Sequence, residues 1–461
     1  MLRPFSSAIE IAAAVNSGKV SAGEVVREAL SRIEKLNPSL NAFTAVTAER
    51  ALSRAEEFDK TRKENSEQRP LAGVPFAAKN LFDIEGLPTI AGSRINRDAA
   101  PAKCDATLIR RLEAAGAILL GALNMGEYAY DFTGENSHDG PSRNPHDPTC
   151  MTGGSSGGSG AAVAGGLVPL SLGSDTNGSI RVPASFCGIF GLKPTYGRLP
   201  RTGTFPFVSS LDHVGPLARS VADLAAAYDA MQGYDAADPV CANRPAQPAR
   251  HLLDEGTKDL RIAVAGGYFR RGAFPEALAA LDCVADFLKT SEIDIPEAER
   301  ARSAAFVITA SEAAELHLGR LRSRAHDFDP AVRDRLIAGA MIPAAFVMKA
   351  QKFRRWYRDH VLELFHKVDA IVAPATPCVA PPIGQTIFEL DGKQIPLRPN
   401  IGIFTQPISF IGLPVVAAPI PLIPLPVAVQ IVAAPGREDI ALRVAHELER
   451  QAIARAPHPK L

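Results

Sequence analysis

A charge-free run near the C-terminal end places the strongest limit on the fold. No charged residue occurs from position 399 to position 436, which is long enough for one membrane-spanning helix. Seven prolines follow Pro399 within the run, and prolines that dense remove helix hydrogen bonds and break a helix repeatedly. Short buried strands joined by proline turns fit better, and we expect them at residues 415–418 and 427–432.

The charge balance argues against a nucleic-acid surface. The chain has 461 residues, with 50 basic and 50 acidic side chains and a formal net charge of +0. Hydrophobic residues make up 46% and charged residues 22%, which is typical of an ordinary globular protein. Because there is neither a basic excess nor an acidic tail, we expect no direct nucleic-acid partner and no membrane partner.

The cysteine pattern bears on location and metal binding. Six cysteines are scattered along the chain, with no CxxC pair and no cysteine–histidine cluster at zinc spacing. We therefore expect free thiols in a reducing cytoplasm and no bound metal. The N-terminal stretch carries Glu10 inside its apolar run and continues as an amphipathic helix, so we do not expect a signal peptide.

Alternating strand and helix patterns begin near Leu71 and indicate an α/β protein with a large, mostly parallel or mixed sheet. Before this point Ser21 and Glu24 form a capping-box pattern, and the first 60 residues are predicted to be helical. Charge is high at residues 56–69, where we expect an exposed helix end and a loop. Further elements are predicted from Leu71 onward: helices at 106–115 and 275–288, a helix capped at Ser220, and strands at 117–121, 167–172 and 261–265.

The domain organisation follows from the absence of internal repeats and linkers. We expect one domain over residues 1–461. Its parts are an N-terminal helical segment, a core that carries the serine and lysine motifs, a variable insertion-like region and a C-terminal part of the core, at residues 1–65, 71–230, 233–360 and 365–461 respectively.

Residues 151–160 read MTGGSSGGSG. Segments rich in glycine and serine are often flexible linkers, but helix and strand patterns flank this one. A glycine-rich turn that opens a helix can bind an anion. However, no lysine–serine or lysine–threonine pair follows the glycines, and the order GxGxxG is absent. Three interpretations stay open: a phosphate loop, a structural turn and a catalytic serine loop.

A second serine motif, GSDTNGSIRVPA, occupies residues 173–184 and places Ser179 in a tight turn beyond a strand. Backbone N–H groups of such a turn can surround a developing oxyanion. A nucleophilic serine also needs a base, and the nearby histidines form no recognisable triad pattern. Lys79, at the end of the apolar run in GVPFAAKN, can serve as a neutral base if burial lowers its pKa. Taken alone, a lysine is more often a solvated surface charge.

Several long motifs together resemble the amidase signature family over nearly the whole chain. They appear in the order GVPFAAKN, GALNMGEYA, GGSSGGSGAAVA, SDTNGSIRVPASFCGIFGLKPT, SLDHVGPLARSVAD, PISFIGLP and PVAVQIVAAP. The resemblance implies one α/β domain in which a large, twisted, mixed sheet is flanked by helices on both faces. It also implies catalysis by a Ser–cis-Ser–Lys triad without a cofactor.

The resemblance assigns roles to individual residues. Lys79 is the implied base, Ser155 the bridge that follows a cis peptide bond, and Ser179 the nucleophile that forms an acyl-enzyme. Supporting roles fall to the Ser156 hydroxyl and to an oxyanion hole formed by the backbone N–H groups of Thr176, Asn177, Gly178 and Ser179. The chain departs from many members at Asn80, where they carry aspartate, and at Asn177, where they carry glycine.

Other segments resemble one subfamily, the 1-carboxybiuret hydrolases of cyanuric acid (s-triazine) degradation. They are KNLFDIEG, AYDAMQG, AAFVITASEA and FRRWYRDHV. This resemblance implies hydrolysis of 1-carboxybiuret to urea-1,3-dicarboxylate and ammonia. It also implies a small helical accessory subunit similar to the C subunit of the tRNA amidotransferases, in a heterotetramer.

An anionic substrate needs a cation in the site, and an arginine fork binds a carboxylate best. The segment SEAAELHLGRLRSR contains three arginines, of which we select Arg322, together with His317 and Tyr130, as substrate-binding residues. The alternative is that these arginines form a solvated helix face. Arg181, two residues after Ser179, is expected to form a structural ion pair.

Other functions fit parts of the pattern. The chain could be the catalytic A subunit of a tRNA-dependent amidotransferase, because partner subunits would bind the tRNA, or an amidase for another small amide. The third alternative is a non-catalytic structural subunit. The presence of all the triad residue types argues against it.

Overall fold

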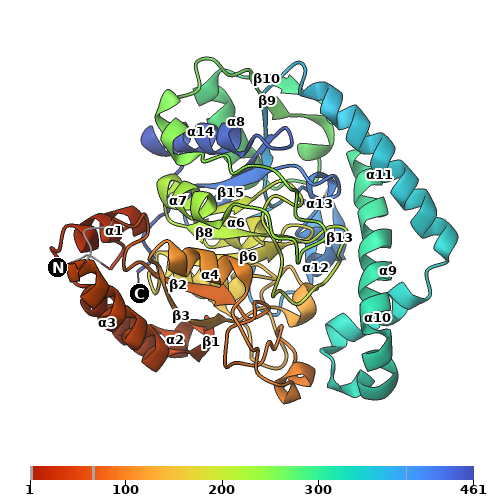
Figure 1. The fold of residues 1–461 in the computed structure, drawn as a ribbon. Coiled ribbons are helices and arrows are strands. Elements are labelled where there is room, and N and C mark those ends of the chain that lie inside the picture. The colour runs from red at the N-terminus through yellow and green to blue at the C-terminus, as the bar shows by residue number, and fades with distance from the viewer. Residues whose placement is uncertain (1–3, 65–67, 391, 461) are drawn as a thin grey trace.

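The computed structural model describes residues 4–64, 68–390 and 392–460. Within these residues an 11-stranded sheet runs through the molecule (Figure 1), in the order β1-β3-β2-β6-β8-β7-β14-β15-β11-β9-β10. Its strands in chain order are β1 Phe43–Val46, β2 Pro75–Lys79, β3 Ile118–Leu123, β6 Leu170–Asp175, β7 Phe190–Lys193, β8 His213–Ala218, β9 Ile262–Ala265, β10 Ser291–Ile293, β11 Ala370–Pro374, β14 Val415–Ile420 and β15 Val427–Ala433. Two small sheets pair β4 Arg143–Asn144 with β5 Asp147–Met151, and β12 Ile387–Leu390 with β13 Lys393–Pro396.

The main sheet is mixed, which confirms the α/β prediction. Strand β2 pairs in parallel with β3 and β6, and β9 pairs in parallel with β10 and β11. The central strands β6, β8, β7, β14, β15 and β11 pair in antiparallel fashion, each with the next. Every residue of β2, β6, β8 and β14 is buried, as expected of strands covered on both faces.

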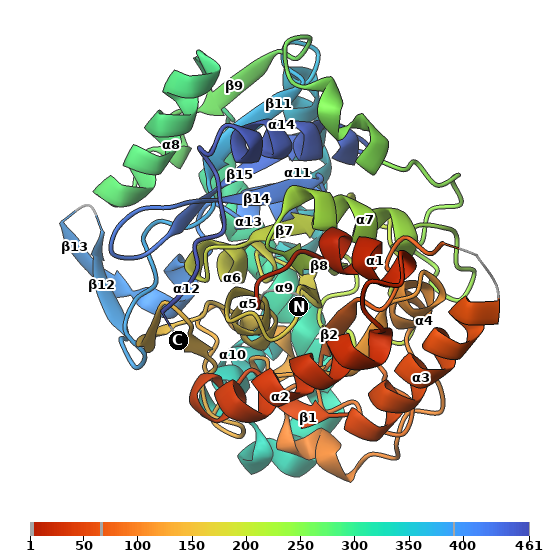
Figure 2. The ribbon, with the colours of Figure 1, turned by 90° about the vertical axis from the view of Figure 1, so that its left-hand side faces the viewer.

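Helices lie on both sides of the sheet, and two groups extend away from it (Figures 1 and 2). Helices α2 and α3 lie at the end of the sheet formed by β1 and β3, α1 packs against α7, and α9 to α11 form an arm along the opposite side. The α-helices are α1 Ala8–Asn16, α2 Ala22–Leu40, α3 Ala48–Glu64, α4 Thr107–Ala114, α5 Gly157–Ala164, α6 Arg181–Phe186, α7 Val221–Met231, α8 Pro275–Leu288, α9 Ala298–Arg324, α10 Pro330–Ala340, α11 Ala344–Leu364, α12 Leu397–Asn400, α13 Gln406–Ser409 and α14 Glu438–Arg450.

Local signals in the sequence placed many element boundaries correctly. The Ser21 capping box starts α2, the Ser220 hydroxyl accepts from the N–H of Asp223 at the start of α7, and α8 spans the predicted residues. The all-helical prediction for the first 60 residues was wrong at β1, which pairs with β3. A four-residue strand with mixed burial leaves little pattern to detect. The charged stretch predicted at 56–69 includes residues 65–67, which lie outside the described residues.

The charge-free run contains β14 and β15, which pair along their whole lengths and are buried throughout. This confirms the two predicted strands. Among the described residues, no helix has the combination of length and apolarity that a membrane crossing requires.

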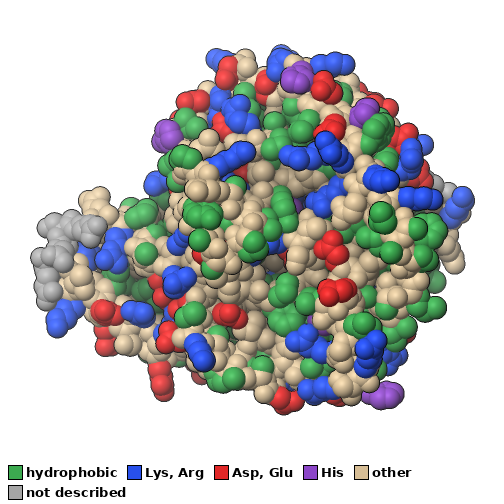
Figure 3. Space-filling model, turned by 45° about the vertical axis from the view of Figure 1, so that its right-hand side comes forward, with side chains coloured by type: hydrophobic (Ala, Val, Ile, Leu, Met, Phe, Trp, Pro, Cys, Tyr) green, Lys and Arg blue, Asp and Glu red, His purple; other side chains and the backbone are tan. Residues whose placement is uncertain are grey.

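The region predicted as insertion-like, residues 233–360, has two parts. Strands β9 and β10 extend one edge of the main sheet, and α9 to α11 form the helical arm. Several large apolar side chains of the arm are exposed: Leu318, Ile337, Met341, Phe346, Met348 and Trp356. Figure 3 shows basic and acidic side chains interspersed over the face that it presents, rather than one patch of a single sign.

Candidate active site

The sheet topology brings the lysine motif and the second serine motif together. Lys79 is the last residue of β2 and Asp175 the last residue of β6, and these neighbouring strands are parallel, with Ala78 opposite Leu172. Ligands of α/β proteins bind outside the carboxyl ends of such strands, because the chain turns away from the sheet there. The turn that contains Ser179 therefore begins next to Lys79.

Three serine hydroxyls surround the amine of Lys79. Its Nζ donates to Ser155 Oγ at 2.6 Å, to Ser174 Oγ at 2.9 Å and to Ser156 Oγ at 3.0 Å. The Ser156 hydroxyl in turn donates to the carbonyl of Ser174 at 3.2 Å. Lys79, Ser155 and Ser156 have no solvent exposure. The lysine is thus held by neutral hydroxyl groups in a dry interior.

Burial lowers the pKa of Lys79 to about 7, because removal from water penalises the charged ammonium. The carboxylates of Asp175, Asp131 and Asp212 oppose this effect and raise the pKa. A lysine with a pKa near 7 is substantially neutral at physiological pH and can accept a proton.

The glycine–serine segment is not a linker, since a short loop after Met151 leads into α5, which begins at Gly157. The N–H groups of Gly153 and Gly154 donate to the carbonyls of Thr133 and Phe132, at 3.2 and 2.9 Å. The peptide bond between Gly154 and Ser155 is cis. These contacts hold the Ser155 hydroxyl against Lys79.

Ser179 lies at the end of a turn whose amides point away from the protein's own acceptors. Over the described part of the chain, the N–H groups of Asn177, Gly178 and Ser179 have no hydrogen-bond acceptor. Gly178 adopts a φ of +145°, and a Cβ there would lie 2.4 Å from Thr405 Oγ1. Only glycine fits this turn, which leaves three N–H groups free for an anionic ligand.

A buried ion pair supports the turn from beneath. Arg181 Nε lies 2.9 Å from Asp175 Oδ2, and neither side chain is exposed. The same carboxylate oxygen accepts from the N–H of Ile180 at 3.2 Å. The predicted structural ion pair of Arg181 is thus confirmed. Removing either partner would leave an uncompensated buried charge.

A small cavity opens onto Ser179. Its volume is about 20 Å³, close to what one water molecule requires. Its lining residues come from several elements: Ala129, Tyr130, Asp131, Phe132, Thr176, Asn177, Ser179, Phe207, Phe306, Thr309, Arg335, Pro399 and Gln406. They include the predicted Tyr130 and no histidine. A substrate larger than water therefore requires lining side chains to move apart.

Two of the predicted substrate-binding residues lie elsewhere. Arg322 is exposed on α9, and the arginine that lines the cavity is a different one. His317 is fully buried, with its ring centroid 4.0 Å from that of Tyr128, and burial lowers its pKa to about 3. Neither residue lines the cavity. Neighbouring residues of a helix point to different sides, and a motif resemblance does not say which residues of α9 face the cavity.

The arginine at the cavity is Arg335 of α10. Its guanidinium carbon lies 3.9 Å from the centroid of the Tyr130 ring, and it donates to the Tyr130 carbonyl. The sequence motifs did not indicate Arg335, nor did they indicate Ser174 at Lys79 or Thr309 at Asn177. Ser174, five residues before Ser179 at the end of β6, could have been found from the strand pattern; the other two depend on how α9 and α10 pack.

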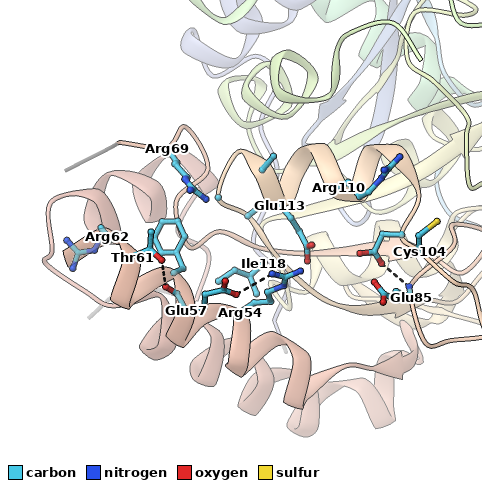
Figure 4. Close-up of a pocket in the computed structure, with 15 residues that line it drawn as sticks. Arg54, Glu57, Thr61, Arg62, Arg69, Glu85, Cys104, Arg110, Glu113 and Ile118 are labelled. Atoms are coloured by element: carbon cyan, nitrogen blue, oxygen red, sulfur yellow. Dashed lines mark hydrogen bonds and ion pairs between the residues drawn. The ribbon is translucent and has the colours of Figure 1, made fainter. Parts of the chain in front are cut away.

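A larger cavity lies in another part of the molecule. It has a volume of about 550 Å³ and is bordered by α3, α4 and β3 (Figure 4). Charged side chains of both signs line it, and Arg54 pairs with Glu57 at 3.3 Å. Lys79 and the three serines of the candidate site do not line this cavity. Across the described residues, no cluster of three or more metal-binding side chains occurs.

Comparisons with known proteins agree with one another. The family model described as Amidase matches residues 24–442. AtzE, a 1-carboxybiuret hydrolase subunit from Pseudomonas sp. (strain ADP), is 54% identical over 97% of this chain and 99% of that protein. The glutamyl-tRNA(Gln) amidotransferase of Methylococcus capsulatus has an A subunit that is 36% identical over 96% of each chain.

Solved structures give the same result. One, described as a vestigial protein complex that reveals the evolutionary origins of an s-triazine catabolic enzyme, has a TM-score of 0.97 and 54% identity, and covers 98% of this chain and 100% of that one. The 6-aminohexanoate cyclic dimer hydrolase with its substrate has a TM-score of 0.88 and 30% identity, with 100% and 99% coverage.

Proposed function

Because the chain belongs to the amidase signature family and is a hydrolase of linear amide C–N bonds, we propose that it releases ammonia from 1-carboxybiuret and forms urea-1,3-dicarboxylate. The observation that carries the substrate assignment is 54% identity to a 1-carboxybiuret hydrolase over nearly the full length of both chains. The amidotransferase relative is less similar, at 36% identity, so tRNA-dependent amidation is the weaker candidate.

The proposed chemistry begins with proton transfer along two serines. Neutral Lys79 Nζ takes the proton of Ser155 Oγ, which takes the proton of Ser179 Oγ. Ser179 Oγ bonds to the terminal amide carbon, and the carbonyl oxygen becomes an oxyanion. The lowered pKa of Lys79 and its 2.6 Å contact with Ser155 support the first transfer.

Collapse of the tetrahedral intermediate completes the first half-reaction. The C–N bond breaks, the proton held by Lys79 returns through Ser155 to the nitrogen, and ammonia leaves. Water then attacks the Ser179 ester with the same groups acting as its base, and the acid is released. The free N–H groups of Asn177, Gly178 and Ser179 support the oxyanion hole proposed here, where each donor contributes about 2.7–4 kcal/mol to the transition state.

We assign the substrate carboxylate to Arg335 in place of Arg322. Arg335 lines the same cavity as Ser179, and its side chain is partly buried over the ring of Tyr130. An arginine fork in a poorly solvated site binds a carboxylate through short, charge-assisted hydrogen bonds. Through this contact Tyr130 orients the guanidinium, which is the role that we propose for it in the site.

We also propose a heterotetrameric assembly with a small helical accessory subunit. The relatives include amidotransferase A subunits, and the solved structure with the TM-score of 0.97 is described as a complex. The apolar side chains exposed on α10 and α11 support a protein partner, since such patches mark interaction sites. The free thiols of all six cysteines support a cytoplasmic location.

The test is an ammonia-release screen with 1-carboxybiuret generated in situ, biuret, malonamate, glutamine and simple aliphatic amides. The chain should be assayed alone and after co-expression with the candidate small subunit, while size-exclusion chromatography reports the assembly. We expect the highest kcat/KM with 1-carboxybiuret. Good turnover of another amide, with none of 1-carboxybiuret, would rule out the substrate proposal and leave the amide chemistry intact.

A further inference from the structure

The side chain of Asn177 stands next to the proposed nucleophile with half of its amide unused. Its Nδ2 donates to Thr309 Oγ1 at 2.9 Å, while Thr405 Oγ1 donates to its backbone carbonyl at 2.6 Å. Asn177 is 7% exposed and lines the cavity with Ser179. Its Oδ1 is buried and, among the described residues, has no hydrogen-bond partner.

A buried acceptor without a donor is a candidate contact for a ligand. Buried polar groups are almost always hydrogen-bonded, because an unpaired one has lost water without a replacement. The hydroxyl of Thr309, which is 2% exposed on α9, accepts from the other half of this amide. The free oxygen is therefore a preset acceptor on a residue that lines the cavity, two residues from Ser179.

We propose that Asn177 Oδ1 is the specificity contact for a ureido substrate: it accepts the N–H that adjoins the carbonyl attacked by Ser179. This inference rests on the proposed function and names the substrate feature that the site selects. Biuret-like molecules carry a nitrogen with a hydrogen beside the reacting carbonyl. Malonamide-like molecules carry a CH2 group of almost the same size there.

The cavity offers matching groups for the rest of such a molecule. Arg335 is a cation on the cavity wall, and the N–H groups of the Ser179 turn are free donors. A substrate with one N–H donor between two carbonyl groups can satisfy Asn177, the turn amides and Arg335 together. A CH2 group leaves Oδ1 unpaired in the complex, so the enzyme discriminates against it in the transition state.

The experiment compares isosteric pairs that differ only at this position: biuret with malonamide, and allophanate with malonamate. The holoenzyme, with its accessory chain where one is required, is assayed for kcat/KM by ammonia release. We expect the wild type to prefer the ureido member of each pair by at least about tenfold, the value of one hydrogen bond. In Asn177→Ala and Asn177→Gly, the preference should fall to within about threefold.

Thr309→Val is the second variant, because it removes the hydrogen bond to the Asn177 amide without replacing any residue of the Ser179 turn. It should reduce the preference in the same direction, and thermal unfolding should show that all three variants fold. A preference that is unchanged in the Asn177 and Thr309 variants would overturn the inference and leave the proposed function standing. If the Asn177 variants lose all turnover, the ratio in Thr309→Val decides. A wild type that hydrolyses no 1-carboxybiuret in the same assay would instead refute the proposed function itself.

Discussion

The amine of Lys79 and the hydroxyl of Ser155 lie 2.6 Å apart, although 76 positions separate them in the chain. Neither side chain reaches solvent. The hydrogen-bond partners of the amine are the hydroxyls of Ser155, Ser156 and Ser174, and within the described residues no ion pair compensates its charge. This lowers its proton affinity, which supports the proposed role of Lys79 as a base in place of histidine.

Replacement of Ser179 tests the proposed nucleophile. Ser179→Ala should lower kcat for ammonia release by at least about a thousandfold, because no acyl-enzyme can form. Circular dichroism and the thermal midpoint should stay close to wild type, since the change removes one oxygen at the edge of a cavity. Retention of near-wild-type turnover would exclude Ser179 as the nucleophile.

The pH dependence tests Lys79. Its pKa is lowered to about 7, and only the neutral amine can accept a proton. The logarithm of kcat/KM should therefore rise with a slope of about one below pH 7 and level off above it. A profile of kcat/KM between pH 5 and 9 checks this, with substrate stability controlled at each pH. A flat profile through pH 6 to 8 contradicts the assignment.

Arg335 should control recognition of the carboxylate. Arg335→Gln should raise KM for 1-carboxybiuret by about ten- to a hundredfold, as expected for loss of a charge-assisted hydrogen bond. Uncharged biuret should be much less affected. Arg322→Gln is the matched control, since Arg322 is exposed on α9 and should leave both substrates unchanged. Equal losses for both substrates in Arg335→Gln would point to a structural role alone.

Gly178 should be irreplaceable in the turn. A Cβ at this position would lie 2.4 Å from Thr405 Oγ1, and φ is +145°. Gly178→Ala should cost about 1–3 kcal/mol in local strain and displace the free N–H groups, with a loss of at least about a hundredfold in kcat. Gly319→Ala is the control, because nothing lies within 4 Å of a Cβ there. It should stabilise α9 by up to about 1 kcal/mol and keep full activity.

Much of the fold could be predicted because its signals are local. Side-chain capping predicted where α2 and α7 begin, and proline spacing excluded a membrane helix from the run that contains β14 and β15. Strand β1 was missed, since four residues with mixed burial leave no clear period. Its pairing with β3 depends on contacts across 75 or more positions.

The sequence by itself determined the residue types and motifs of the candidate site: Lys79, the serines of the glycine-rich loop and Ser179. The tertiary structure decided which of these side chains meet and how burial changes the pKa of Lys79. Parallel pairing of β2 with β6 brought Lys79 beside Ser174, and complete burial lowered its pKa. The packing of α9 and α10 decided that Arg335 and Thr309 face the cavity while Arg322 faces solvent. Burial and side-chain direction arise from long-range packing, so no local pattern contains them.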